Sequence, residues 1–499
     1  MNTRIFAITI AVFSFAGFAA LRAAKPSASN SVRAPAAMRS TLPSEKTAKM
    51  VLNSTTRHRE WIHVRLGSAT IWAFLVYPQR SDSAPVVVVT AKNQGASDWI
   101  RAVSDQVAAE GFIAVVPDVL SGLGPNRGGT ESFANNDAVV AALDRLDRNE
   151  AARRIEAVRK YAVSLPAANG KSASFEFSPG SGDAAWHSAI TLLTTETGNK
   201  PVFAESPSAN MASMSAADHS AHMMMAMAQP SAAAPPAAQG APRGYPLGKL
   251  PELPAGLFNA KSTLLHSTLR KEFVDIPAGN VKLHTWIEYP QGNDKAAVIL
   301  VMQHGPGMDD WQRALEDQLA LEGFIAVAPD LYSGLGPNGG NFDSFDGSDD
   351  AMRAAAKLTQ DEGIRRYKAA YDYAMKLPRA NGKSASLGFC VGGGYSFRFA
   401  GEVPEINAAV VFYGTQPSEE IMAKIKAPVL GFYGEDDARV TSTVEPTIVS
   451  MKKLDKFYEP HIYPHGTHGF LEYQDLAGNP AAVTDSWQRT IAFLRQQTK

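Results

Sequence analysis

The chain has 499 residues, of which 45% are hydrophobic, and its formal net charge at pH 7 is −1. This length exceeds one ordinary domain and the apolar content supports packed cores, so two globular domains are expected and a disordered chain is excluded. The near-neutral charge gives no electrostatic basis for binding nucleic acid or an anionic membrane surface.

The N-terminus has the pattern of a secretory signal peptide. Arg4 precedes an apolar run over 5–20, and small residues suit cleavage between about Ala19 and Ala24. The alternative is an uncleaved membrane anchor, but the run is short for a span and no later stretch is apolar enough. We therefore expect residues 1–24 to be removed, the protein to be periplasmic or secreted, and no stable membrane insertion after cleavage. The Ser-, Ala- and Pro-rich residues 25–54 are expected to form a disordered lead-in.

Two parts of the chain repeat each other at a constant offset. GFIAVVPDVLSGLGPN (111–126) recurs as GFIAVAPDLYSGLGPN (323–338), an offset of 323 − 111 = 212. ANGKSAS recurs with the same offset, at 168–174 and 380–386. A constant offset over such a span predicts a duplicated unit. We place the first copy at 55–200 and the second at 261–499, separated by an Ala-, Met- and Pro-rich linker at 201–260.

The linker contains a cluster of potential soft-metal ligands. Its segment MASMSAADHSAHMMMAMA (211–228) brings His219, His222, Met223 and Met224 close together in sequence. Thioether and imidazole groups suit Cu(I), so copper binding is one interpretation, and a plain flexible linker is the other. Elsewhere the sequence predicts no metal site and no cofactor.

Apolar strands alternate with helices along the second unit. The run 295–303 is apolar from Ala296 to Met302, as a strand covered on both faces should be. Helical periodicity at 311–323 and 363–377 separates it from later strands, which we expect at 324–329, 384–389, 408–413, 428–433 and 458–463. This alternation predicts an α/β fold with a mainly parallel sheet and helices on both faces.

A possible nucleophile follows the strand at 384–389. Cys390, the only cysteine, lies in GFCVGGG (388–394), where Gly388 and Gly392 flank it at the spacing of a sharp strand-to-helix turn. The N–H of Val391 could stabilise an oxyanion. A single thiol cannot form an intramolecular disulfide, which favours a reactive role. The alternative is a small buried residue in a glycine-rich turn.

The first copy lacks these features. Ser178 stands 212 residues before Cys390, but Glu176 replaces the flanking glycine and Pro179 has no N–H to donate. The later strands also have no counterpart before the linker. We therefore predict a truncated, inactive copy that docks on the catalytic domain or on another chain, covering an exposed sheet edge.

Candidate partners for the thiol follow in the order acid, then histidine. GFYGEDDARV (431–440) offers Glu435, Asp436 and Asp437, and YPHGTHGF (463–470) offers His465 and His468. Each group follows a predicted strand, so both are expected at the carboxyl edge of the sheet. Position alone does not choose among them.

The second unit, about 270–499, resembles the dienelactone hydrolase family of α/β-hydrolases. The resemblance is carried by APDLY (328–332), GFCVGGG (388–394), GEDDARV (434–440) and HGTHGF (465–470). It implies a triad of Cys390, Asp437 and His468, and an oxyanion hole from the N–H groups of Val391 and Gly305. The implied reaction is hydrolysis of a small-molecule ester or lactone. The first unit resembles the front part of the same fold.

Three positions depart from the family pattern. His304 stands where the family has a glutamate that hydrogen-bonds the resting cysteine, while Gly334 and Glu472 stand where it has two substrate-binding arginines. One hypothesis is that His304 stabilises a Cys390 thiolate, and the other is that it only shapes the pocket. We expect an exported cysteine-dependent ester or lactone hydrolase. The alternative is a non-enzymatic, possibly copper-handling, binding protein on a hydrolase scaffold.

Overall fold

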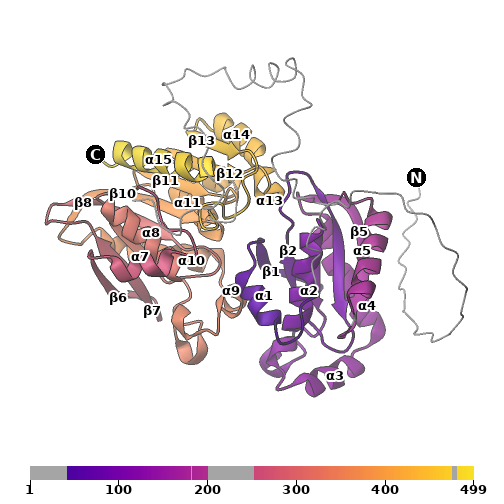
Figure 1. Ribbon diagram of the computed structural model, residues 1–499. Helices are drawn as coiled ribbons and strands as arrows, with labels where there is room; N and C mark the ends of the chain where they lie inside the picture. Colours follow the sequence, from indigo (N-terminus) through magenta and orange to yellow (C-terminus); the bar gives the residue numbers. More distant parts are fainter. Residues whose placement is uncertain (1–41, 181, 201–251, 475–479) are drawn as a thin grey trace, which may run out of the picture.

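The computed structural model describes residues 42–180, 182–200, 252–474 and 480–499. Its larger β-sheet belongs to the second unit. Its eight strands lie in the order β13-β12-β11-β10-β8-β9-β7-β6 (Figure 1). Neighbouring strands are parallel except in the pairs β6–β7 and β7–β9. The strands are β6 (Arg270–Ala278), β7 (Val281–Tyr289), β8 (Ala296–Met302), β9 (Ile325–Pro329), β10 (Ala380–Phe389), β11 (Ala408–Phe412), β12 (Val429–Gly434) and β13 (Tyr458–Tyr463).

Helices cover both faces of this sheet. One face packs against α10 (Gln360–Ala374), α11 (Val391–Glu402) and α14 (Val444–Lys453), and the other against α8 (Asp310–Leu321) and α15 (Pro480–Gln497). Shorter helices are α7 (Ala260–His266), α9 (Ser348–Ala355), α12 (Glu419–Met422) and α13 (Ala438–Thr441). The predicted α/β-hydrolase architecture is confirmed. No helix within the described ranges is both long and apolar enough to cross a membrane.

The first unit repeats the front of this fold. Its sheet has the order β1-β2-β4-β3-β5, which matches β6-β7-β9-β8-β10 strand for strand. The strands β11 to β13 have no counterpart among its described residues, so β5 is an edge strand. Its elements are α1 (Ala48–Ser54), β1 (Arg59–Leu66), β2 (Ala69–Val76), β3 (Ala84–Ala91), α2 (Asp98–Ala109), β4 (Ile113–Asp118), α3 (Asn136–Arg145), α4 (Arg148–Val163), β5 (Ala168–Phe177) and α5 (Asp183–Thr197).

Two predicted boundaries are wrong. Residues 42–54 were expected to be part of a disordered lead-in, but they include α1, because Ala48 and Leu52 share one helix face and pack into the core beside α2. The predicted linker also ends earlier than residue 260, since Leu253 and Ala255 are buried in the core of the second unit. The predicted signal peptide and the four candidate metal ligands His219, His222, Met223 and Met224 lie outside the described residues.

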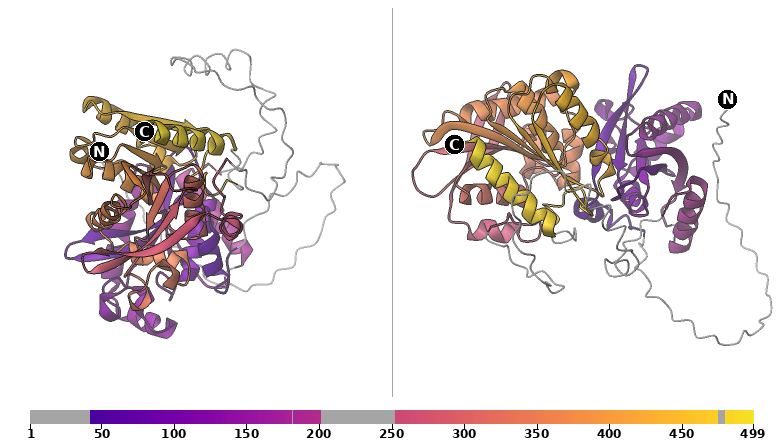
Figure 2. Two further views of the ribbon diagram at one scale, coloured as in Figure 1. Left: turned by 90° about the vertical axis from the view of Figure 1, so that its left-hand side faces the viewer. Right: turned by 90° about the horizontal axis from the view of Figure 1, so that it is seen from above.

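The two units dock side by side (Figure 2). The contact involves the β1–β2 side of the first unit, and β5 lies at the opposite edge of its sheet. Arg101 on α2 forms a buried ion pair with Asp349 on α9, and the N–H of Ala438 donates to the carbonyl of Arg80 at 3.0 Å. The first unit thus docks on the catalytic unit, which is one of the two expected arrangements. It does so through its β1–β2 side, however, and not through β5, the edge strand that the truncation exposes.

A buried carboxyl on β7 gives the first testable prediction. Burial raises the pKa of Glu288 to about 8, and the neighbouring carboxyl of Asp317 contributes to this increase, whereas the charge of Lys271 opposes it. Between its ordinary value of 4.5 and about 8, the folded protein keeps a proton that the unfolded chain releases, so this group lowers stability as the pH rises. Glu288→Gln should therefore raise the free energy of unfolding at pH 8 by on the order of 2 kcal/mol, and by less at pH 5. Urea unfolding at both pH values measures this, and a gain independent of pH would contradict it. The partly exposed Glu272→Gln is the control.

Candidate active site

Cys390 occupies a strained turn between β10 and α11. Its backbone angles are φ 56° and ψ −121°, a conformation that L-residues rarely adopt. The flanking glycines are required by contact: a Cβ on Gly388 would lie 1.9 Å from the carbonyl oxygen of Gly392, and a Cβ on Gly392 would lie 2.1 Å from that of Met302. The turn therefore holds the thiol at the carboxyl edge of the sheet, as the GFCVGGG pattern predicts.

Among the candidate acids and histidines, the structure brings Asp437 and His468 together. Oδ2 of Asp437, just after β12, lies 2.6 Å from Nδ1 of His468, and both side chains are buried. His468 in turn has a ring nitrogen within 4.8 Å of the Cys390 sulfur. By contrast, the side chain of His465 is 85% exposed and lies 3.9 Å from Asp436. Of the candidates that follow Cys390 in the sequence, Asp437 and His468 thus form a single Cys–His–Asp arrangement with it.

The charges in this arrangement favour a thiolate and an imidazolium. Burial would raise the pKa of the Cys390 thiol, but the charges of His468 and His58 and their hydrogen bonds lower it well below its usual value. Burial would lower the pKa of His468, but Asp437 and Cys390 raise it to about 9. A thiolate is the nucleophilic form of cysteine, so the site is charged for attack on an electrophile.

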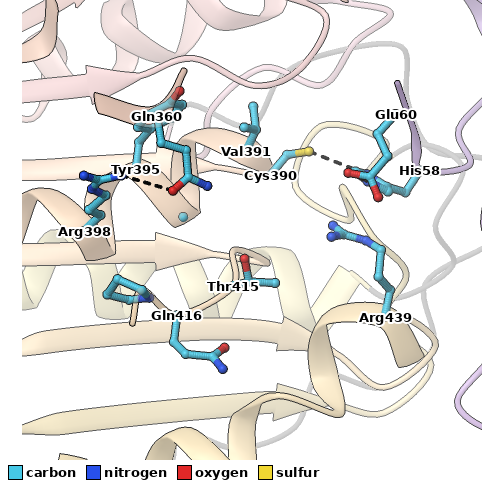
Figure 3. Close-up of a pocket in the computed structure, with 12 residues that line it drawn as sticks. His58, Glu60, Gln360, Cys390, Val391, Tyr395, Arg398, Thr415, Gln416 and Arg439 are labelled. Carbon is cyan, nitrogen blue, oxygen red and sulfur yellow. Dashed lines mark hydrogen bonds and ion pairs between the residues drawn. The ribbon is translucent and has the colours of Figure 1, made fainter. Parts of the chain in front are cut away.

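His58 is a site residue that the sequence analysis missed. It lies just before β1 in the first unit, yet its Nδ1 is 3.7 Å from the sulfur of Cys390 (Figure 3). Its ring centroid is 4.5 Å from that of His468. No local motif marks it. The one available signal is a difference between the two copies of the repeat: the position 212 residues after His58 is Arg270, so the histidine occurs in the first copy alone.

His304 has other partners, contrary to the hypothesis that it stabilises the thiolate. Its Nδ1 lies 3.0 Å from Oε2 of Glu472 and its Nε2 lies 3.3 Å from Oδ1 of Asp309. Burial opposes its protonation, but these two carboxylates raise the pKa of His304 well above its usual value. The departures at 304 and 472 therefore form one internal ion pair. Gly334 stands at the third departure from the family pattern, and its backbone φ of 79° lies in the left-handed region that favours glycine.

Two cavities border Cys390. The larger, of about 200 Å³, is lined on one side by Val391, Tyr395 and Thr415 and on the other by His58, Glu60 and Arg439 (Figure 3). The smaller, of about 40 Å³, is lined by residues that include His304, Gly305, His468 and Glu472. Val391 is the first residue of α11, so its N–H is one of the groups that a helix start leaves without an intrahelical partner. Gly305 is fixed by a hydrogen bond from the Tyr332 hydroxyl to its carbonyl.

Ser178 occupies the equivalent turn of the first copy, between β5 and α5. The strands that carry Asp437 and His468 in the second copy, β12 and β13, have no counterpart among the described residues of the first. Inactivity of the first copy stays a prediction.

Among the described residues, three groups of side chains could hold a metal ion by proximity alone: His58–Cys390–His468, His304–Asp309–Glu472 and Glu435–Asp436–His465. The first is the candidate nucleophile with its two imidazoles. In the second, the histidine bridges two carboxylates. The third is largely exposed. Such groups commonly occur without metal, so proximity does not indicate a metal centre.

Comparison with known proteins identifies the family of the chain. The model of the dienelactone hydrolase family matches residues 71–224 and 283–498, together more than half of the chain. A Saccharolobus solfataricus protein described as "Putative carboxymethylenebutenolidase" is 30% identical over 250 residues, which cover 44% of this chain and 95% of that protein. A Salmonella typhimurium protein with the same description is 27% identical over 267 residues, covering 49% and 96%.

Solved structures include the same family. The structure titled "Putative Dienelactone Hydrolase" from Klebsiella pneumoniae is 23% identical and covers 46% of this chain and 100% of that chain, with a TM-score of 0.42. The family model matches both repeats, which is consistent with the duplicated unit. The chain belongs to the dienelactone hydrolase family.

Proposed function

We propose that the protein is an exported, cysteine-dependent hydrolase of carboxylic esters or lactones that acts through Cys390, His468 and Asp437. Family membership makes it a hydrolase of the dienelactone hydrolase type. The observation that carries the proposal is the buried contact of 2.6 Å between His468 and Asp437, beside a thiol in a strained turn. A nucleophile, a base and a group that orients the base are the parts that acyl transfer needs.

The chemistry follows from these positions. The Cys390 thiolate attacks the carbonyl carbon, an S–C bond forms, and the C=O electron pair moves to oxygen, where the N–H groups of Val391 and Gly305 are candidates to stabilise it. Collapse expels the alkoxide, which takes the proton from His468. His468 then removes a proton from water, hydroxide attacks the thioester, and the thiolate leaves with the acid as product. Asp437 orients the imidazole throughout.

The substrate binds, in this proposal, in the cavity of about 200 Å³ beside Cys390. Arg439 borders this cavity with its guanidinium toward it, and its buried Nε has no hydrogen-bond partner among the described residues. No carboxylate of the described part lies within ion-pairing distance of Arg439, although its group packs over the Tyr77 ring at 5.4 Å. Glu60 and Asp437 act on this cation through space, but among the residues that the structure describes it has no direct ion pair. A cation so placed favours a substrate that carries an anionic or strongly polar group near the scissile carbonyl.

Replacing Arg439 should therefore change substrate preference. We expect Arg439→Met to raise KM about tenfold for a carboxylate-bearing ester and to leave KM for its neutral methyl-ester analogue nearly unchanged, because only the former loses a charge-assisted hydrogen bond. Steady-state kinetics with the substrate pair measures this. Arg398→Met is the control, since Arg398 borders the same cavity but is already paired with Asp361 and Glu402. Equal losses for both substrates would contradict the assignment.

Export is part of the proposal and rests on the N-terminal sequence. Arg4 and the apolar run over 5–20 support it. Expression of the full chain in a bacterial host, followed by fractionation and N-terminal sequencing, tests it. A mature protein that begins between about residues 20 and 25 in the periplasm or medium is expected, and an intact N-terminus in the cytoplasm would contradict export.

Hydrolysis through a cysteine is tested by trapping the acyl-enzyme. p-Nitrophenyl acetate should be hydrolysed, and acid quenching during turnover should leave an acetyl group on the peptide that contains Cys390, the only cysteine of the chain. Mass spectrometry locates this group. Turnover without an acetylated Cys390 would contradict the mechanism, and absence of turnover with every ester and lactone in a screen would favour the binding-protein alternative.

A further inference from the structure

His58 is held rigidly by the first unit. Its carbonyl accepts a hydrogen bond of 3.0 Å from the N–H of Tyr77 at the end of β2. The hydroxyl of Tyr77 donates to Glu60 at 3.0 Å, and Oε2 of Glu60 lies 3.9 Å from Nε2 of His58. The His58 side chain is only 10% exposed. The imidazole therefore has its Nε2 toward a carboxylate and its Nδ1 toward the sulfur of Cys390.

Comparison with the second copy separates the contacts of His58 that both copies share from those found in the first copy alone. Glu60 and Tyr77 correspond to Glu272 and Tyr289, whose side chains are hydrogen-bonded in the same way, at 2.8 Å. This Tyr–Glu pair is thus common to both copies. His58 corresponds to Arg270, whose guanidinium lies over the Tyr289 ring at 4.6 Å. The imidazole at this position is specific to the copy that docks against Cys390.

Docking of the two units determines where His58 lies. Close to it, the N–H of Ala438, next to Asp437, donates to the carbonyl of Arg80 at 3.0 Å. Farther away, the buried pair of Arg101 and Asp349 joins α2 to α9. The same interface that joins the units thus carries His58 to the nucleophile.

We propose that the active site is composite and that His58 of the N-terminal repeat is a catalytic residue, which stabilises the Cys390 thiolate from a position beside the catalytic base, with its ring centroid 4.5 Å from that of His468. This rests on the proposed hydrolase function and assigns a role to the truncated copy. His468 gives its proton to the leaving group and takes one from water, so it cannot remain a donor to sulfur throughout the cycle. His58 takes no part in these transfers, and its Nδ1–H can donate to the thiolate at rest and again when the thioester breaks.

Other charged or titratable groups around the two side chains act on the same ionisation, so an experiment has to hold them constant. They are His468, Asp437, Glu60, Arg439, Tyr77, Tyr332 and Tyr413. Arg57, Arg59, His304, Glu472 and Tyr473 also line the smaller cavity that His58 and Cys390 border. Substitution at 58 leaves all of them in place.

The experiment measures the rate of alkylation of Cys390 by iodoacetamide against pH, in the full chain without substrate. For His58→Ala, we expect the half-maximal pH to rise by about one unit and kcat/KM for p-nitrophenyl acetate at pH 6 to fall roughly tenfold. His58→Asn places an amide N–H near the position of Nδ1 and should shift the half-maximal pH less. The control is His63→Ala on the adjoining strand β1, where His63 packs against Trp72, and no shift is expected.

The outcomes separate this inference from the proposed function. If His58→Ala matches the wild type in both readouts while Cys390→Ala is inactive, the composite site is wrong and the hydrolase proposal stands. If Cys390→Ala still hydrolyses ester at the wild-type rate, the hydrolase proposal fails. If His58→Ala does not fold, as judged by circular dichroism, His58→Phe decides, because it keeps a ring but has no N–H to donate, and a half-maximal pH equal to that of the wild type would overturn the role of His58.

Discussion

Replacing Cys390 with alanine should reduce kcat/KM for p-nitrophenyl acetate by about 10³-fold or more. The variant loses the only thiol of the chain, and with it the nucleophile that forms the covalent intermediate. Alanine adds no bulk to the turn, so the fold should be retained. Initial-rate kinetics on the purified variant, with circular dichroism to confirm folding, makes the comparison.

The duplication supplies a matched control for this experiment. Ser178 occupies the equivalent turn, between β5 and α5, and Ser178→Ala should leave the rate unchanged. Pro179 follows Ser178, so the N–H that Val391 can offer next to Cys390 is missing. A loss of rate in Ser178→Ala comparable to that in Cys390→Ala would show that the first copy is active, and would overturn its assignment as an inactive copy.

Much of this site could be predicted because its information is local in the sequence. The turn around Cys390 needs glycines at fixed spacing, and a Cβ at Gly388 or Gly392 would clash with backbone. The strands β8 and β12 of the second unit are buried apolar runs, so the end of β12, and hence the position of Asp437, follows from the alternation of elements. The strand before His468, β13, is of mixed polarity and gives a weaker signal.

The unpredicted parts depend on contacts between distant segments. His58 reaches Cys390 only because two units dock, and no pattern around residue 58 specifies that interface. His304 alone suggests a contact with the thiol, whereas His304 and Glu472 taken together indicate a contact with each other. A histidine replacing an acid, together with an acid replacing an arginine, is what an internal ion pair requires, and the distance of 3.0 Å between them is the physical reason for the correction.

The second large effect concerns the interface between the units. Asp349→Ala should lower the free energy of unfolding by on the order of 3 kcal/mol, because it leaves the buried guanidinium of Arg101 with only the half-exposed Asp98 as a carboxylate partner. Both side chains are almost fully buried, at 1% and 3% exposure. Burial opposes ionisation of Asp349, but Arg101 lowers its pKa below the ordinary value of 3.8. The pair therefore contributes fully above the unfolded pKa and loses its contribution as the pH falls through the folded value.

An exposed ion pair in the same interface provides the control. Lys49 and Asp346 lie 2.6 Å apart, but their side chains are 40% and 90% exposed, so Asp346→Ala should change stability by less than about 1 kcal/mol. Urea unfolding at pH 7 compares the two variants, and equal effects would contradict a special role for burial. The double variant Arg101→Met, Asp349→Leu should recover most of the loss, since apolar side chains of similar volume remove the unpaired charge. Because this interface also carries His58 to Cys390, Asp349→Ala should raise the half-maximal pH of alkylation, although Asp349 itself lies outside the active site.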